Sequence, residues 1–168
     1  MKIVMDVGYD GTKANAATVA FQNWDDESSI SFNKIIINNI ANYESGFFYK
    51  RELPCLMQSL ESYNLENVDT IIVDGFVWLN SEKKAGLGAY LFDALERKIP
   101  IIGVAKRKFH GNNIFMQPIE RGKSKNPLFI TAAGIALNQA ADLIKNMHGE
   151  YRIPTLLKEV DRLSREWE

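Results

Sequence analysis

The chain has 168 residues, 46% of them hydrophobic and 24% charged, with a formal net charge of −1. This length and composition are typical of a globular protein with one core, so we expect residues 1–168 to form a single domain, and the charge excludes a globally basic nucleic-acid binder. The single cysteine, Cys55, excludes an internal disulfide, and without a signal peptide or an apolar run of about 20 residues we expect a cytoplasmic protein with no membrane contact.

The first part of the chain predicts three antiparallel strands. Lys2–Tyr9 is an apolar run with one carboxylate, Asp6, and the turn residues Asp10-Gly11 follow it. Ala16–Trp24 is β-rich and can pair with the first run as a hairpin. Ile30–Ile40 combines alternation with a run of isoleucines, which favours a third strand.

The middle of the chain predicts a loop and then helices separated by short buried strands. The expected order is a loop at Ala41–Phe48, a helix at Lys50–Tyr63 with Pro54 in its first turn, a strand at Asp69–Asp74, a helix at Glu82–Lys98 and a strand at Ile99–Ala105. A strand, a crossover helix and a second strand predict a right-handed parallel βαβ unit.

The last part predicts two more strands and two helices. The strands are expected at Asn112–Pro118 and Pro127–Thr131, and the helices at Ala132–His148 and Pro154–Trp167. The whole order predicts an α/β fold of the ribonuclease-H-like arrangement. Its mixed sheet would have five to six strands, three antiparallel and then parallel, flanked by helices.

Three carboxylates fall where such a fold carries its chemistry. Asp6 lies in the central strand, Asp74 ends a parallel strand, and Glu52 lies where a loop enters a helix. At about 5 Å and an effective dielectric near 20, each pair of such charges costs roughly 3 kcal/mol. Divalent cations remove that repulsion, and oxygen ligands favour Mg²⁺ or Mn²⁺ over zinc. The trio therefore predicts metal-dependent phosphodiester hydrolysis.

Four short stretches, in this order, resemble endonuclease V, the inosine-directed nuclease of the ribonuclease-H-like superfamily. They are Met5–Tyr9, Phe48–Leu53, Val73–Gly75 and Gly103–Lys106, and the resemblance extends from Asp6 to about Asp161. It implies catalytic roles for Asp6, Glu52, Asp74 and Lys106, with Lys106 beside the scissile phosphate.

The resemblance continues near the end of the chain. Arg152-Ile153-Pro154 is similar to the family's arginine-leucine-proline stretch, and Asp161 takes the place of the acidic or histidine residue that follows it. The resemblance implies that Asp161 completes a metal site formed with Asp6, Glu52 and Asp74. The alternative for Asp161 is a solvated helix carboxylate.

The family's strand-separating wedge and base pocket also have counterparts. Tyr43 and Gly46 match the wedge, while Asn42 and Ser45 replace its prolines, which makes it less rigid. The resemblance implies a pocket for the flipped base at Gly46, Phe48, Gly75, Gly103 and Ala105. Val77 and Asn80 depart from the family, which has a glycine and a histidine at these positions.

The resemblance implies a Mg²⁺-dependent endonuclease, with Mn²⁺ as a substitute, that acts on inosine-containing DNA or RNA as in DNA repair. The family cuts the second phosphodiester 3′ of the lesion and leaves 3′-hydroxyl and 5′-phosphate ends. A basic cluster favours nucleic-acid contact: Lys106, Arg107, Lys108, His110, Arg121, Lys123 and Lys125. We infer no obligate protein partner. The alternatives are a junction-resolvase-type nuclease of the same fold and a nucleic-acid-binding homologue with weak catalysis.

Overall fold

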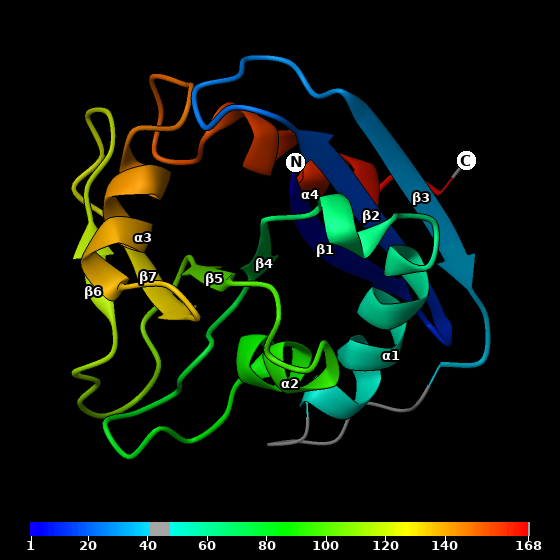
Figure 1. The fold of residues 1–168 in the computed structure, drawn as a ribbon, viewed down its shortest axis with the longest axis horizontal. Coiled ribbons are helices and arrows are strands. Elements are labelled where there is room, and N and C mark those ends of the chain that lie inside the picture. Colours follow the sequence, from blue (N-terminus) through cyan, green and yellow to red (C-terminus); the bar gives the residue numbers. More distant parts are fainter. Residues whose placement is uncertain (41–47, 168) are drawn as a thin grey trace.

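A computed structural model describes residues 1–40 and 48–167, with the side chain of Phe48 left out. Within these residues one mixed sheet has seven strands in the order β3-β2-β1-β4-β5-β7-β6 (Figure 1). The strands are β1 (Lys2–Asp10), β2 (Lys13–Phe21), β3 (Ser31–Ile37), β4 (Thr70–Asp74), β5 (Ile101–Ala105), β6 (Gln117–Ile119) and β7 (Leu128–Ala133). The predicted α/β fold is confirmed, but five to six strands was too few.

The sheet begins antiparallel and becomes parallel at its centre, as predicted. β1 and β2 form a hairpin from Lys2↔Phe21 to Asp10↔Lys13, closed by Gly11 at a φ of 61°. β1, β4 and β5 then run parallel, and β7 returns antiparallel to β5. The carboxyl ends of β1, β4 and β5 therefore meet at one edge of the sheet.

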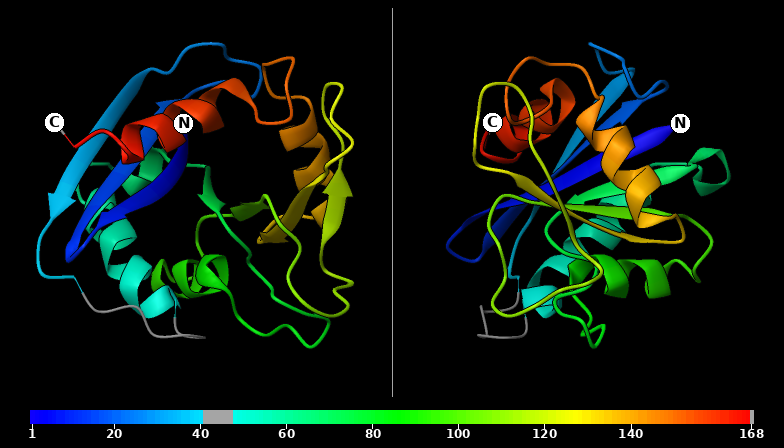
Figure 2. Two further views of the ribbon diagram at one scale, coloured as in Figure 1. Left: turned by 180° about the vertical axis from the view of Figure 1, so that it is seen from behind. Right: turned by 90° about the vertical axis from the view of Figure 1, so that its left-hand side faces the viewer.

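Four α-helices cover the two faces of the sheet in the part of the chain described. They are α1 (Phe48–Leu60), α2 (Leu87–Ala94), α3 (Leu137–Lys145) and α4 (Thr155–Ser164), with a short 3₁₀ turn, η1 (Leu65–Asn67). α1 and α2 pack on one face with Ile3 and Met5, whereas α3 and α4 lie on the other (Figure 2). Val4 packs on this second face, so β1 is buried on both sides, which explains its unbroken apolar run.

Several predicted element boundaries were wrong. α1 begins at Phe48, so Pro54 lies inside the helix and not in its first turn. α2 is much shorter than the predicted Glu82–Lys98 because the preceding residues form a turn, with Lys83 at a φ of 57°. The predicted strand at Asn112–Pro118 is reduced to β6. The expected loop at Ala41–Phe48 lies, except for Phe48, outside the described residues.

No helix in residues 1–40 and 48–167 combines the length and the apolar character that crossing a bilayer needs.

Candidate active site

Asp6 and Asp74 lie side by side, Asp6 in the middle of β1, where its parallel pairing with β4 stops, and Asp74 at the carboxyl end of β4. The parallel register pairs Met5 with Val73, which brings the next residue of each strand to the same level. Asp6 is only 8% exposed, and its carboxylate accepts hydrogen bonds from the Val7 N–H at 2.9 Å and the Ser164 hydroxyl at 3.1 Å. Burial first, and then the charge of Asp74, raise the pKa of Asp6 to about 7, although these two hydrogen bonds oppose the shift.

Glu52 reaches the same edge of the sheet from α1. It is 4% exposed, and its Oε2 atom is buried without a hydrogen-bond partner among the described residues. Burial, followed by the charges of Asp6 and Asp74, raises the pKa of Glu52 well above its usual range, and Arg51 opposes the shift. A buried acceptor without a donor is costly, so this oxygen is suited to a cation or a proton.

Lys106 and Asp161 complete the acidic cluster. The Lys106 Nζ atom lies 3.7 Å from Asp74 Oδ2 and 3.8 Å from Asp161 Oδ1. The pKa of Asp74 is raised, mainly by burial and also by the charge of Asp161, while the Lys106 ammonium opposes this shift. Asp161 lies on α4, and its contact with Lys106 shows that the helix brings its carboxylate to the site. The same carboxylate also pairs with Arg165 at 2.7 Å.

Two hollows share this edge of the sheet. The acidic pocket has a volume of about 600 Å³ and is lined by Asp6, Val7, Tyr9, Glu52, Asp74, Gly75, Phe76, Ala105, Lys106 and Arg107. The aromatic pocket has a volume of about 340 Å³ and is lined by Tyr49, Asp74, Gly75, Phe76, Leu79, Lys84, Ala85, Gly86, Leu87 and Phe109. Asp74, Gly75 and Phe76 line both, so the acids lie next to an apolar recess.

The acids are near one another but do not form a closed cage. Within the described part of the chain, no three His, Cys, Asp or Glu side chains converge closely enough to hold one ion. The Lys106 ammonium lies within 4 Å of both Asp74 and Asp161, where it offsets part of the negative charge. The donor chemistry nevertheless fits Mg²⁺ or Mn²⁺, because every candidate ligand is a carboxylate and Glu52 carries an unpartnered oxygen.

The structure separates the residues expected at the base pocket. Tyr43 and Gly46 lie outside the described residues, and Phe48 begins α1. Gly75, at a φ of 140°, lines both hollows, and Ala105 lines the acidic pocket. Gly103 is buried in β5 and lines neither hollow. A Cβ atom added at Gly103 would lie 2.5 Å from the Gly75 carbonyl oxygen. The lack of a side chain at Gly103 serves close packing behind the Gly75 turn.

The two departures from the family pattern point away from the aromatic pocket. Val77 is fully buried and faces Gly88 of α2, and its N–H donates to the Thr131 hydroxyl at 2.8 Å. The Asn80 side chain accepts hydrogen bonds from the N–H groups of Glu82 and Lys84, both at 3.1 Å. Both residues therefore shape the chain around the pocket and do not fill it.

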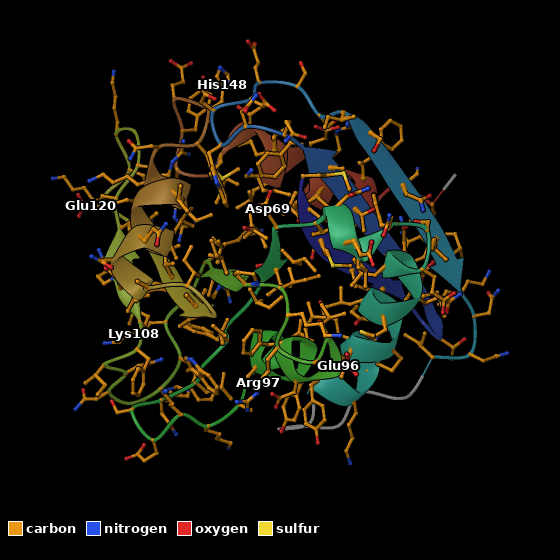
Figure 3. The ribbon with its side chains drawn as sticks, in the orientation of Figure 1. Asp69, Glu96, Arg97, Lys108, Glu120 and His148 are labelled. Carbon is orange, nitrogen blue, oxygen red and sulfur yellow. The ribbon has the colours of Figure 1, made fainter. Side chains whose placement is uncertain are left out.

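The expected basic cluster includes one residue with a different role. Arg121 is 5% exposed, and its guanidinium donates to backbone carbonyls of residues 145–152, so it is not a surface contact for nucleic acid. The other members are exposed on the loop after β5 and on the β6–β7 turn. Figure 3 shows Lys108 on the β6 side of the molecule.

Sequence reasoning missed two contributors to the site. Ser164 hydrogen-bonds Asp6, but no sequence interval links two residues that are 158 positions apart. Tyr9 lines the acidic pocket with the Arg51 guanidinium 3.8 Å from its ring centroid, and its buried hydroxyl has no partner within the described residues. No sequence interval pointed to Tyr9, because residues three apart on a strand face opposite sides of the sheet.

Comparison with known proteins identifies the family of this chain. The sequence profile of the endonuclease V family matches residues 3–129, whereas none of the curated proteins matches the sequence significantly. Human ENDOV has the same fold, with a TM-score of 0.77 and 22% identity over 98% of this chain and 82% of its own. An endonuclease V from Ciona intestinalis, solved with a 23-mer DNA containing an inosine, has a TM-score of 0.81 and 18% sequence identity, over 98% of this chain and 83% of its own. Endonuclease V from Streptomyces avermitilis has a TM-score of 0.74 and 20% sequence identity, over 97% of this chain and 78% of its own. The chain belongs to the endonuclease V family, and the suspected resemblance is confirmed.

Proposed function

We propose that this chain is a divalent-metal-dependent endonuclease that cuts nucleic acid near inosine. The observation that carries the proposal is the meeting of Asp6, Glu52 and Asp74 at the open edge of the sheet, beside Lys106. Family membership supports nuclease chemistry. The inosine-containing DNA bound by the Ciona intestinalis enzyme supports a deaminated purine as the recognised lesion.

The carboxylates that would ligate divalent metal are those of Asp6, Glu52, Asp74 and Asp161, whose side chains would have to draw closer together than they lie in this structure. When bound, Mg²⁺, or Mn²⁺ in its place, supplies Lewis-acid activation of water and stabilises charge on the phosphate. The pKa values of Asp6 and Glu52 are raised, so both carboxyl groups would have to be deprotonated to act as ligands. The Glu52 Oε2 atom, which has no partner among the described residues, is available for such a role.

Lys106 would hold the phosphate beside these acids. In the free protein its ammonium lies near Asp74 and Asp161, both under 4 Å away. The Lys106 ammonium is 40% exposed, so it could turn from these two carboxylates to face a phosphate oxygen. The acidic pocket is open and has space for a sugar-phosphate strand at this edge.

The aromatic pocket would take the flipped inosine base. Tyr49 lines it, and the Tyr49 ring is fixed by stacking on Tyr90 at 3.8 Å between ring centroids. Phe109 lines it too, in edge contact with Phe76 at 6.3 Å. Aromatic faces and the open backbone at Gly75 suit a planar base. Tyr43, Gly46 and Phe48 would form the wedge and the nearby pocket wall.

The cut would fall at the second phosphodiester 3′ of the lesion and leave 3′-hydroxyl and 5′-phosphate ends. Residues 1–168 would act as one domain in the cytoplasm, on DNA or on RNA. RNA and DNA are told apart by contacts to 2′-hydroxyl groups, which a direct comparison of the two substrates measures.

A cleavage assay on matched DNA and RNA strands, with and without one inosine, tests the proposal. We expect Mg²⁺-dependent cutting of the inosine strands and no cutting by Asp74→Ala. Asp69→Ala is the matched control, because Asp69 directly precedes β4, at the end of the strand opposite Asp74, and pairs with the N-terminus at 3.0 Å.

Three outcomes would reject the proposal. Equal cutting by Asp74→Ala would exclude this site. Cutting of four-way junctions without inosine would favour the resolvase-type alternative, and Mg²⁺-dependent thermal stabilisation without cleavage would favour a binding homologue.

A further inference from the structure

We infer that Arg152 is a positioning residue that acts through Lys106, an inference that rests on the proposed function of Lys106. The Arg152 guanidinium does not face the acidic residues. Its Nη2 atom donates to the Lys106 carbonyl at 2.6 Å and to the Pro127 carbonyl at 2.9 Å, and its Nε atom donates to the Asn126 carbonyl at 2.9 Å.

The hydrogen bonds from Arg152 fix the Lys106 backbone just beyond the point where the strand pairing of the sheet ends. The β5–β7 ladder ends at the pair Ala105↔Phe129, so Lys106 is the first residue beyond the paired backbone. Arg152 bridges its carbonyl to the residues that lead into β7. The guanidinium has donors in a fixed planar fork, so it sets the distance between these segments, which the ammonium of a lysine cannot do.

Arg152 is itself fixed from the interior by a second arginine. The buried Arg121 guanidinium donates to the Arg152 carbonyl at 3.2 Å, to the Met147 carbonyl at 2.7 Å and to the Gly149 carbonyl at 3.0 Å. It also bonds the carbonyls of Lys145 and Tyr151. The segment that carries Arg152 is therefore tied to the core through neutral backbone groups.

The partners of both arginines are backbone carbonyls, which leaves their charge without a counter-ion in the described part of the chain. Arg97, Arg162 and Arg165 pair with carboxylates, in contrast. Carbonyl dipoles satisfy the guanidinium hydrogen bonds without cancelling the full positive charge. Arg152 therefore acts on Lys106 through hydrogen bonds to its backbone and not through an ion pair with a carboxylate of the site.

The expected effect is on turnover more than on binding. With Arg152 in place, the Lys106 backbone stays fixed when its ammonium leaves Asp74 and Asp161 for a phosphate. A displacement of about 1 Å at a reacting group costs on the order of 100-fold in rate. We therefore expect Arg152→Ala to lower kcat by about 10- to 100-fold, with a smaller change in KM.

A double-mutant cycle on inosine-strand cleavage tests whether Arg152 acts through Lys106. Arg152→Ala should have almost no further effect in a Lys106→Ala background. Arg152→Lys keeps the charge but not the fork, so it should be impaired like Arg152→Ala, and it carries the test if the alanine variant does not fold. Arg97→Ala, which removes an exposed ion pair between Arg97 and Asp93 just after the end of α2, should match the wild type.

Backbone NMR relaxation of the same variants separates this inference from the proposed function, because it needs no substrate. Arg152→Ala and Arg152→Lys should lower the backbone order parameters of residues 106–108 and leave those of Ile101–Ala105 unchanged, whereas Arg97→Ala should change neither. Unchanged order parameters at 106–108, full activity of Arg152→Lys, or an undiminished Arg152→Ala effect in the Lys106→Ala background would each overturn the inference. A wild-type protein that cuts no inosine strand would overturn the proposed function, while the order parameters would still decide whether Arg152 holds Lys106.

Discussion

Ser164 and Asp6 are joined by a hydrogen bond, with Ser164 Oγ 3.1 Å from Asp6 Oδ2, although 158 positions separate them. The contact exists because the end of α4 lies directly on the β1–β2 hairpin. Gly8 has no side chain to displace the Ser164 carbonyl, and the opposite residue, Asn15, donates to the carbonyls of Leu163 and Glu166 at 2.9 and 2.7 Å. The same helix carries Asp161 to the site.

Replacing Ser164 should weaken metal binding. The single hydroxyl proton of Ser164 is shared between the Asp6 carboxylate at 3.1 Å and the Asp161 carbonyl at 2.8 Å. Ser164→Ala removes this partial donor to Asp6, so the charged form that binds a cation becomes less favourable. We expect the Mn²⁺ dissociation constant, measured by calorimetry, to rise by about tenfold. Ser59→Ala is the matched control, since Ser59 is equally buried in a helix but bonds only the carbonyls of Cys55 and Leu56. An equal Mn²⁺ affinity in both variants would show that Ser164 does not support Asp6.

A methyl group at Gly8 should push α4 away from the site. An added Cβ there would collide with the Ser164 carbonyl, which is backbone and cannot rotate aside. We expect Gly8→Ala to cost about 1–3 kcal/mol or more in urea unfolding and to reduce cleavage. Gly11→Ala meets no atom within 4 Å and loses only about 1–2 kcal/mol from its positive φ, so it should stay active. A Gly8→Ala protein that is fully active and no less stable than the wild type would be inconsistent with this packing.

The metal-free protein should lose stability as the pH rises from about 4 to 7. The folded-state pKa of Asp6 is raised from 3.8 to about 7, so in this range the folded chain binds more protons than the unfolded chain. Its contribution is fully present below the unfolded pKa and is lost as the pH rises through the folded pKa. The rise in the pKa of Asp6 corresponds to a loss of folding free energy on the order of 4 kcal/mol over this pH range.

Urea unfolding in the presence of a chelator, at pH values from 4.5 to 8, measures this slope. Asp6→Asn should flatten it, leaving a part that comes from Glu52 and Asp74, whose pKa values are also raised. Added Mg²⁺ should stabilise the wild type more at pH 8 than at pH 5.5, because ligands must be deprotonated to bind. Identical slopes for the wild type and Asp6→Asn would refute the role given to Asp6.

The β6–β7 turn should contribute phosphate contacts through its exposed lysines. Each phosphate contact adds about 0.9 to the slope of log affinity against log salt, so Lys123→Ala with Lys125→Ala should reduce that slope by up to about 2. Lys98→Ala is the control, since Lys98 precedes β5 at the opposite edge of the sheet. Fluorescence anisotropy at several salt concentrations measures the slope, and an unchanged slope in the double variant would remove this turn from the interface.

The sequence predicted the features that follow from local pattern. Asp74 ends a short apolar strand before a glycine, and Asp6 interrupts an apolar run, so Asp74 could be placed at a strand end and Asp6 within a central strand. Arg121 could not be separated from its basic neighbours, because burial against the carbonyls of residues 145–152 depends on how that segment folds back. The start of α2 was predicted too early because Glu82, Lys83 and Lys84 are residues that favour helices, whereas the Asn80 side chain holds them in a turn.

Mn²⁺ binding followed by electron paramagnetic resonance tests most directly whether Asp6, Glu52 and Asp74 act as one metal site. The wild type should bind Mn²⁺ at pH 7.5, and both Glu52→Gln and Asp74→Asn should lose most of that affinity while remaining folded. Asp69→Asn, at the other end of β4, should bind like the wild type. Mn²⁺ binding that is unchanged in Glu52→Gln and Asp74→Asn would contradict the account.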